Sequence, residues 1–413
     1  MKMWVYLVRR LLLLIPVVIG VMTITFVLVN SLPVQEQLQV FLGPTKQAGG
    51  YSPTLPPGSL GCNATLHPNG CANPTYVHAI DALGLNQPKE VQWGKYIYNS
   101  LTLNWGNTDK ASIASSSIGL DTSMSVIVVL SWYLPYTLEL AALALAIILL
   151  LAIPIGNYSA AYRNRPFDQG ARILSFSGFA FPGFLLAVLA LFAITDLSGG
   201  LGATFCGSTS TAYDQWYGSW PDPSCLINSM YPSWMTSHLA TTPTGFPTVD
   251  AVYHALTDSS ARYRAQDWYL AGESVKRMII PALVIAFGSI AGILRYVRNS
   301  MLEVMSLDFI RTARAKGVSE RRVIGYHAGR NSLNVTVTVL GLVFAGFIGG
   351  FPIYEEVFGI DGVGRLLVNS VSPAGPDFGL VFGTTLLFTF IVVIANIIVD
   401  LLYAYLDPRV RLG

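Results

Sequence analysis

The chain has 413 residues, of which 52% are hydrophobic and only 12% are charged, and its formal net charge is +2. Soluble globular domains carry about 25% charged residues, so this composition excludes an ordinary soluble protein and predicts one that crosses a membrane several times. The net charge says little by itself, because the basic residues are distributed unevenly along the chain.

Six stretches are long and apolar enough to span a bilayer about 30 Å thick, which takes roughly 20 helical residues. The first follows Lys2, Arg9 and Arg10 and could be mistaken for a signal peptide. It is too long for the apolar part of such a peptide, and no small-residue cleavage site follows it, so we expect it to be kept as a span. The six predicted spans lie near 7–30, 134–161, 173–196, 277–297, 333–353 and 380–405.

The basic residues indicate which segments face the cytoplasm. Four short segments hold 16 of the 25 Lys and Arg, namely 1–10, 162–172, 295–332 and 406–413. Short loops rich in Lys and Arg stay on the cytoplasmic side. The sequence therefore predicts an all-α polytopic membrane protein with six transmembrane helices and both termini inside.

This topology divides the chain into five parts. Two of them are insertions that together give the outer face roughly 180 residues, enough for a compact domain. The predicted parts are the first transmembrane helix at 1–30, an extracytoplasmic insertion at 31–133, helices two and three at 134–196, a second extracytoplasmic insertion at 197–276, and helices four to six at 277–413 with a cytoplasmic loop at 298–331.

All four cysteines, Cys62, Cys71, Cys206 and Cys225, lie in the insertions. An even number of cysteines confined to one face predicts disulfides in an oxidising compartment. Three connectivities are open, and pairing of sequence neighbours is one of them. No C-x₂-C spacing points to structural zinc. In the same region, Asn63-Ala64-Thr65 is a candidate glycosylation sequon.

The second insertion is rich in aromatic residues and poor in charge. Its aromatic side chains could form a platform for carbohydrate or peptide, or they could be the core of the outer region together with an interfacial belt. We favour the second interpretation. The residues are Trp216, Tyr217, Trp220, Tyr231, Trp234, Tyr253, Trp268 and Tyr269.

A polar segment at 295–330 separates two apolar stretches and carries eight Lys or Arg against three acids. Asp308 is placed to cap a short helix, and Gly317 can supply the left-handed residue that ends it. Ser319 is then placed to cap a second helix. Small residues in the first helix would let another surface approach closely. The segment is predicted to be a docking element, although a solvated connector remains open and a DNA-binding helix-turn-helix is disfavoured by the flanking membrane segments.

The run 311–317, followed by His327-Ala328-Gly329-Arg330, resembles the EAA loop of ABC-importer permeases. More narrowly, it is similar to the dipeptide/oligopeptide permease family, whose loop reads D-[YF]-[IV]-x-T-A-x-A-K-G-x-S. In that family the loop forms a coupling helix that fits a groove on a separate ATPase subunit. Gly329 stands where the family usually has Leu, and we expect it to loosen the second helix. The resemblance implies coupling roles for Asp308, Arg311, Thr312, Ala313, Ala315, Lys316, Gly317 and Ser319.

A second matching motif follows the fifth predicted span. It resembles the family's E-T-V-F-x-x-P-G-x-G signature, with Asp361 where Pro is usual. Adjacent carboxylates could suggest acid–base catalysis, but no partner His or metal-ligand spacing accompanies them, so we expect an outer gating loop and neither a catalytic nor a metal site. The residues of this predicted loop are Glu355, Glu356, Phe358, Gly362 and Gly364.

The resemblance covers about 1–42, 83–196 and 277–413, and it implies a permease subunit of an ATP-driven importer in the cytoplasmic membrane. Its partners would be a second, related permease, two ATPase subunits that bind ATP and Mg, and an extracytoplasmic solute-binding protein. The chain itself has no phosphate-binding G-x-x-x-x-G-K-[ST] loop, so we expect neither enzymatic activity nor a cofactor in it. The family transports dipeptides and oligopeptides, and some members transport oligosaccharides or nickel chelates.

Two other classes of function remain as alternatives. An ATP-independent channel or secondary transporter would be expected to show charged residues deep inside the spans or an inverted repeat. Glu139, Asp196 and Asp400 all lie near span ends, and no internal repeat is evident. A membrane receptor would explain the large insertions but would leave the coupling loop without a role.

Overall fold

The fold is taken from a computed structural model. It describes residues 3–35, 37–38, 52–55, 69, 71–108, 124–197, 249, 252–253, 256, 261–332, 351–360, 362–371 and 377–406. The chain divides into two compact units. The first contains residues 1–11, 135–362 and 392–413, and the second contains 12–134 and 363–391.

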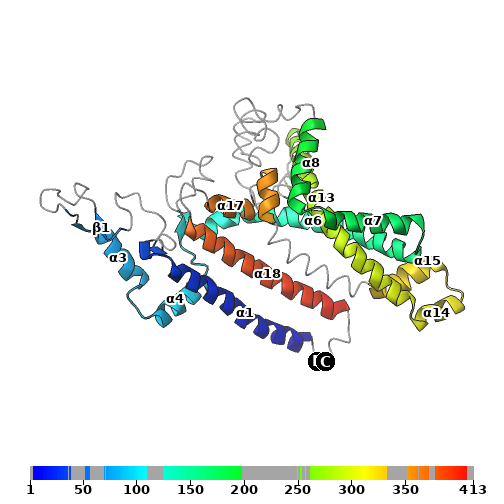
Figure 1. The fold of residues 1–413 in the computed structure, drawn as a ribbon, viewed down its shortest axis with the longest axis horizontal. Coiled ribbons are helices and arrows are strands. Elements are labelled where there is room, and N and C mark those ends of the chain that lie inside the picture. The colour runs from blue at the N-terminus through cyan, green and yellow to red at the C-terminus, as the bar shows by residue number, and fades with distance from the viewer. Residues whose placement is uncertain are drawn as a thin grey trace. The chain divides into compact units, whose positions relative to one another are not determined.

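The first unit consists of helices joined by short turns in its described residues. Its long helices are α6 (Val126–Ala161, from Pro135 onward in this unit), α7 (Pro166–Ala180), α8 (Gly183–Leu197) and α13 (Ala261–Met305). Three short elements follow α13, namely α14 (Asp308–Ala315), α15 (Glu320–Arg322) and the π-helix η2 (Val323–Ala328). Figure 1 shows α14 and α15 at the end of α13 that lies away from α8. A further helical segment at 351–358 completes the described part.

The helix predicted at 173–196 is sharply bent. The axes of α7 and α8 meet at 100°. Phe181 between them has an extended backbone (φ −104°, ψ 126°), as expected for a residue that precedes proline. Pro182 then begins the next helix by accepting hydrogen bonds from the N–H groups of Leu185 and Leu186. The predicted span at 173–196 is therefore a helix broken at Pro182.

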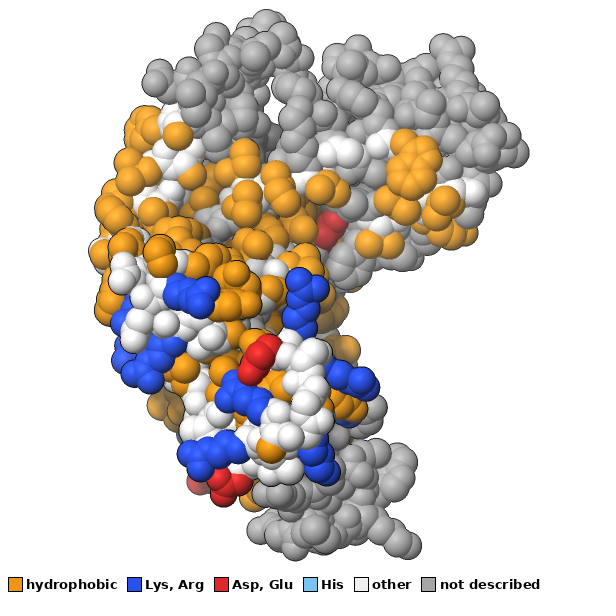
Figure 2. Space-filling model, turned by 90° about the vertical axis from the view of Figure 1, so that its right-hand side faces the viewer, with side chains coloured by type: hydrophobic (Ala, Val, Ile, Leu, Met, Phe, Trp, Pro, Cys, Tyr) orange, Lys and Arg blue, Asp and Glu red, His pale blue; other side chains and the backbone are white. Residues whose placement is uncertain are grey.

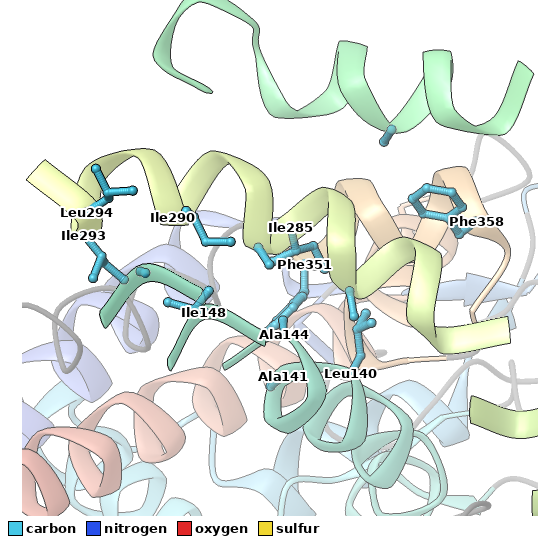
Figure 3. Packing of buried hydrophobic residues seen from close by; sticks show 14 of the residues in the cluster. Leu140, Ala141, Ala144, Ile148, Ile285, Ile290, Ile293, Leu294, Phe351 and Phe358 are labelled. Carbon is cyan, nitrogen blue, oxygen red and sulfur yellow. The ribbon is translucent and has the colours of Figure 1, made fainter. Parts of the chain in front are cut away.

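The core of the first unit lies where α6, α13 and the segment 351–358 meet (Figure 3). Its buried side chains are mostly aliphatic, with Phe351 and Phe358 as the largest. Two glycines allow the helices to approach closely. A Cβ on Gly156 of α6 would lie 2.7 Å from Cγ1 of Val297 on α13. A Cβ on Gly178 of α7 would lie 2.4 Å from the Cβ of Ala291, also on α13.

The second unit combines helices with two short β-ladders. It contains α1 (Met3–Ser31, from Leu12 onward), α3 (Pro74–Leu83), α4 (Lys89–Leu101), α17 (Val363–Ser370) and the first part of α18 (Phe378–Leu406). The strands β1 (Thr54–Leu55) and β2 (Cys71–Ala72) pair antiparallel, as do β3 (Asn107–Thr108) and β4 (Met124–Ser125). These strands were not predicted from the sequence.

Hydrogen bonds attach the amphipathic helix α4 to α1. The indole N–H of Trp93 donates to Thr23 Oγ1 at 3.0 Å, and Lys89 Nζ donates to Asn30 Oδ1 at 2.6 Å. Met22, Tyr96 and Trp105 are buried in one cluster with residues of α6, α17 and α18. The part of the first insertion near α4 is thus packed against the first apolar helix.

The predicted spans can be compared with the observed helices. The stretches 7–30, 134–161, 277–297 and 380–405 lie inside α1, α6, α13 and α18. Among the described residues three helices are long and apolar enough to cross a membrane, or four if the α7–α8 pair counts as one span. The span at 333–353 lies outside the described residues except for its last three. The insertion boundaries at 133 and 276 fall within α6 and α13, because these helices begin at Val126 and Ala261.

Candidate functional site

The predicted coupling segment forms a short helix, α14, directly after α13. Its N-cap is Leu307, which has an extended backbone and provides no side-chain hydrogen bond. Asp308 is the first helical residue, so the expectation that it caps the helix is wrong. Its carboxylate still lies at the positive end of the helix dipole, and it pairs with Arg311 Nη1 at 3.2 Å. Both side chains are largely exposed, so the pair contributes little to stability.

The end of α14 is a Schellman motif centred on Gly317. This residue has φ +74°, in the left-handed region where glycine has no Cβ penalty. Its N–H donates to the carbonyl of Arg314 at 3.0 Å, and the N–H of Val318 donates to that of Ala313 at 3.2 Å. These are the two bonds that define the motif. The prediction that Gly317 ends the helix is confirmed.

The two faces of α14 differ. Ile310 and Ala313 are buried, where they pack with Ala160 of α6, Met301 of α13 and residues of η2. The other predicted coupling residues of the helix face outward. Ala313 therefore contacts its own chain, while the exposed residues of the helix are Asp308, Phe309, Arg311, Thr312, Arg314 and Ala315, followed by Lys316.

The second helix of the loop begins at Ser319, as predicted, but the cap is a backbone one. The Ser319 carbonyl accepts from the N–H groups of Arg322 and Val323 at 2.9 and 3.0 Å, and its side chain makes no cap bond. Glu320 instead binds Arg314 Nε at 2.7 Å. After three residues the helix widens into η2, where π-type bonding replaces α-type bonding. This change was not predicted from the sequence, although π-helical turns are frequent at functional sites.

Gly329 follows η2 within the helix at φ −58°. A Cβ there would lie 3.1 Å from the carbonyl oxygen of Ile324 and 3.9 Å from Asn157 Nδ2 of α6. The tight neighbour of such a Cβ is therefore the carbonyl of Ile324 in the same helix, whereas its distance from α6 is an ordinary van der Waals contact. The expected loosening is not visible as a break, because residues 329–332 remain helical.

A buried carboxylate that the sequence analysis missed lies beside this loop. Asp168, in the first turn of α7, is fully buried and pairs with Arg298 of α13 at 2.7 Å. Arg298 is the largest cause that holds the pKa of this carboxyl well below its usual range. Burial acts in the opposite direction, and Arg172, Ser159 and the N–H of Asn164 lower the pKa further. The available signal was that Asp168 is the only acid in the basic segment 162–172.

Basic side chains gather on the surface of the first unit near the coupling loop. Figure 2 shows Lys and Arg concentrated in the lower part of the described surface and hydrophobic side chains above them. The ring of Tyr162, close to the α6–α7 turn, lies under the guanidinium of Arg165, 5.1 Å from its carbon. Aromatic and basic residues adjoining an apolar surface are typical of a membrane–water interface.

The predicted outer loop contains a second buried carboxylate. Glu355 is fully buried and accepts a 2.7 Å hydrogen bond from Thr137 Oγ1 of α6. A Cβ on Gly362 would lie 2.3 Å from the Glu355 carboxylate, so only glycine fits there. The helical segment ends in a Schellman motif at Gly359 (φ +65°), and Phe358 is buried in the core.

The other predicted residues of this loop differ in their exposure. Glu356 is half-buried, and Gly364 is buried in the first turn of α17. Asp361 lies outside the described residues. Within the described part of the chain no group of three or more His, Cys, Asp or Glu could hold a metal ion.

Of the predicted modification sites, only Cys71 lies in the described part. It is in β2 and is disulfide-bonded. The cysteine to which it is bonded is not among the described residues. The same is true of all the other predicted modification sites, namely Cys62, Cys206, Cys225 and the sequon residue Asn63. The connectivity therefore stays a prediction.

Comparison of the sequence with known proteins places this chain in a family. The family described as binding-protein-dependent transport system inner membrane component matches residues 152–412. The oligopeptide transport system permease protein AppB of Bacillus subtilis (strain 168) is 27% identical over 406 residues, which cover 98% of this chain and 99% of that protein. A putative peptide transport system permease protein of Brucella abortus (strain 2308) is 32% identical over 341 residues, covering 82% and 86%. The probable D,D-dipeptide transport system permease protein DdpB of Escherichia coli (strain K12) is 31% identical over 335 residues, covering 80% and 83%.

Proposed function

The chain belongs to the family of binding-protein-dependent transport system inner membrane components, and we propose that it is the permease subunit of an ATP-driven importer of dipeptides and oligopeptides. The observation that carries the proposal is the form of α14. It is a short helix with one face buried on the chain's own helices and the other exposed for a partner. The relatives are named as oligopeptide, peptide and D,D-dipeptide permeases, which supports peptides over oligosaccharides or nickel chelates as cargo.

In the proposed complex this chain pairs with a second permease, and each permease offers a coupling helix to an ATPase subunit. A solute-binding protein delivers the peptide on the outer side. ATP and Mg bind to the ATPase subunits, and their closure displaces α14. A displacement shifts the equilibrium between inward-open and outward-open forms only if α14 makes different contacts in the two forms.

The proposed topology puts both termini, the α6–α7 turn and α14 inside the cell and the two insertions outside. It is supported by the positive charge of the inner segments and by the interfacial residues at Tyr162 and Arg165. A large outer region pinned by disulfides would then be available to receive the binding protein.

The proposal is tested by purifying the tagged chain from its native membranes in mild detergent and identifying the proteins that accompany it. We expect a second permease and ATPase subunits. Thr312→Trp and Ala315→Trp place a bulky ring on the exposed face of α14, and each should reduce ATPase capture by about tenfold, equivalent to 1.4 kcal/mol. Uptake of a labelled dipeptide into vesicles carrying the complex should fall in parallel.

The matched control is Gly94→Trp on α4, an exposed helical glycine with nothing within 4 Å of a built Cβ. It should leave ATPase capture unchanged. Ala313→Trp, on the buried face, should lower the stability of the chain itself. Recovery of the intact wild-type chain without ATPase subunits under several mild conditions would argue against the proposed function.

A further inference from the structure

The carboxylate of Asp168 holds together three helices and a turn. Its Oδ1 accepts from Ser159 Oγ of α6 at 2.6 Å and from Arg298 Nε of α13 at 2.7 Å. Its Oδ2 accepts from Arg172 Nη2 at 2.5 Å, from the N–H of Asn164 at 2.9 Å and from Arg298 Nη2 at 3.1 Å. Five hydrogen bonds thus converge on one side chain of α7.

This carboxylate is charged and buried, so the loss of one of its partners would leave the charge poorly compensated. The fork of Arg298 binds both of its oxygens, which fixes direction as well as distance. A buried charge that loses its partner is left uncompensated, which is strongly destabilising. The folded pKa is lowered, so this stabilisation is fully present above the unfolded pKa of about 3.9 and is lost only as the pH falls from there through the folded pKa. At neutral pH the carboxylate remains ionised.

The Arg298 side chain lies on the stretch of α13 that leads into the coupling loop. Met301, one turn further along, packs against Ala160 of α6 and against Ile310 and Ala313 of α14. The far end of the loop returns to the same stretch, because Ser300 Oγ donates to the carbonyl of Ser332 at 3.1 Å, and both residues are buried. The buried face of α14 therefore rests on the helices that Asp168 connects.

The same helices are also closely packed at two glycines. Gly156 of α6 lies against Val297, the residue before Arg298, and Gly178 of α7 lies against Ala291. We therefore expect close packing and the salt bridge together to transmit a force on α14 to α6, α7 and α13. An exposed pair such as Arg311–Asp308 could not transmit such a force, because water competes for both charges.

We propose that Asp168 is a positioning residue for transport. Through its salt bridge to Arg298, it makes the α6–α7 turn move together with the coupling helix α14 when the ATPase closes. The inference rests on the proposed importer function. Without this salt bridge, α14 would still bind the ATPase. Its displacement would then move α13 relative to the α6–α7 turn and would not move the turn itself. ATP would then be hydrolysed with less peptide moved.

The test uses the complete complex with both permeases, the ATPases and the binding protein, reconstituted in vesicles. Labelled peptide uptake and ATP hydrolysis are measured on the same preparation, and both are divided by the amount of assembled complex. Asp168→Asn keeps the shape of the side chain and removes its charge. We expect the variant complexes to assemble, to bind the ATPase subunits and to hydrolyse ATP. They should transport roughly tenfold fewer peptides per ATP, which lies within the 5–150-fold effects typical of allosteric coupling.

The matched control is Arg163→Lys. Arg163 lies exposed in the same α6–α7 turn, and none of the five hydrogen bonds to Asp168 comes from it, so its replacement should change peptides per ATP by less than about twofold. Arg298→Lys keeps the charge and removes the fork, and it should lower the ratio at least about fivefold. This variant decides the matter if Asp168→Asn fails to assemble.

Unchanged peptides per ATP in Arg298→Lys and in assembled Asp168→Asn would show that the salt bridge only stabilises the fold, and the inference would be rejected. A wild-type complex that neither captures ATPases nor takes up peptide would instead contradict the proposed function. The wild-type arm thus separates the two failures.

Discussion

At the scale of single residues, Gly362 shows how closely a backbone can be packed against a charged side chain. A Cβ there would lie 2.3 Å from the Glu355 carboxylate. That carboxylate cannot move away freely, because it is buried and bonded to Thr137. Packing therefore explains Gly362 in the motif of the predicted outer loop, because the position of a buried acid requires glycine there.

Replacing Gly362 with Ala should destabilise the chain by about 1–3 kcal/mol, the usual cost of overpacking. The measurement is the thermal unfolding midpoint of the detergent-solubilised chain. Gly170→Ala is the matched control, since it lies in α7 with nothing within 4 Å of a built Cβ and should be neutral or stabilising by up to about 1 kcal/mol. Equal midpoints for the two variants would contradict the steric explanation.

Residue-scale features were predicted unevenly from the sequence. Gly317 was predicted correctly because a left-handed helix end has a strong local preference for glycine. Asp308 was misplaced by one position, since helix boundaries depend on backbone bonding that propensity does not resolve. Asp168 was missed because its partners Arg298 and Ser159 are brought together only by folding.

At the scale of elements, α14 is a two-turn helix, too short to be stable on its own. Its stability comes from the buried Ile310 and Ala313 and from the Schellman end. We therefore expect the helix to be sensitive to its terminal residue. The bend between α7 and α8 follows the same logic, because a single proline at 182 changes the path of a continuous apolar stretch.

Gly317→Ala should place a Cβ in the left-handed region at a cost of about 1 kcal/mol, and Gly317→Asn should cost less. Hydrogen exchange of the amides in 310–318 measures this directly. We expect roughly fivefold faster exchange for the Ala variant, since 1.36 kcal/mol corresponds to tenfold. Gly325→Ala in the same loop has nothing within 4 Å of its Cβ and should not accelerate exchange. An Asn variant that exchanges faster than the Ala variant would refute the left-handed argument.

At the scale of the whole molecule, topology was predicted from charge. The arrangement assigns the α6–α7 turn to the inside and α4 to the outside. Arg163 and Tyr98 are exposed residues of these two regions, so each can be replaced by cysteine with little effect on packing. The prediction can be tested without any knowledge of the transported molecule.

In intact cells, a membrane-impermeant maleimide should label Tyr98→Cys but not Arg163→Cys. In inverted vesicles the pattern should reverse, because the positive-inside rule places the basic turn in the cytoplasm. The unsubstituted chain serves as the control for the native cysteines. Labelling of both positions from the same side would overturn the six-span arrangement.

The sequence by itself determined the membrane class, the family and the approximate positions of α1, α6, α13 and α18. These follow from composition, local hydropathy and a contiguous motif, which need no knowledge of distant contacts. Tertiary structure alone decided that Ala313 faces inward, that the loop widens into η2 and that Glu355 and Asp168 are buried among partners from other helices. The physical reason is that burial and pairing of a side chain depend on which helices come together, and that information is absent from any single stretch of sequence.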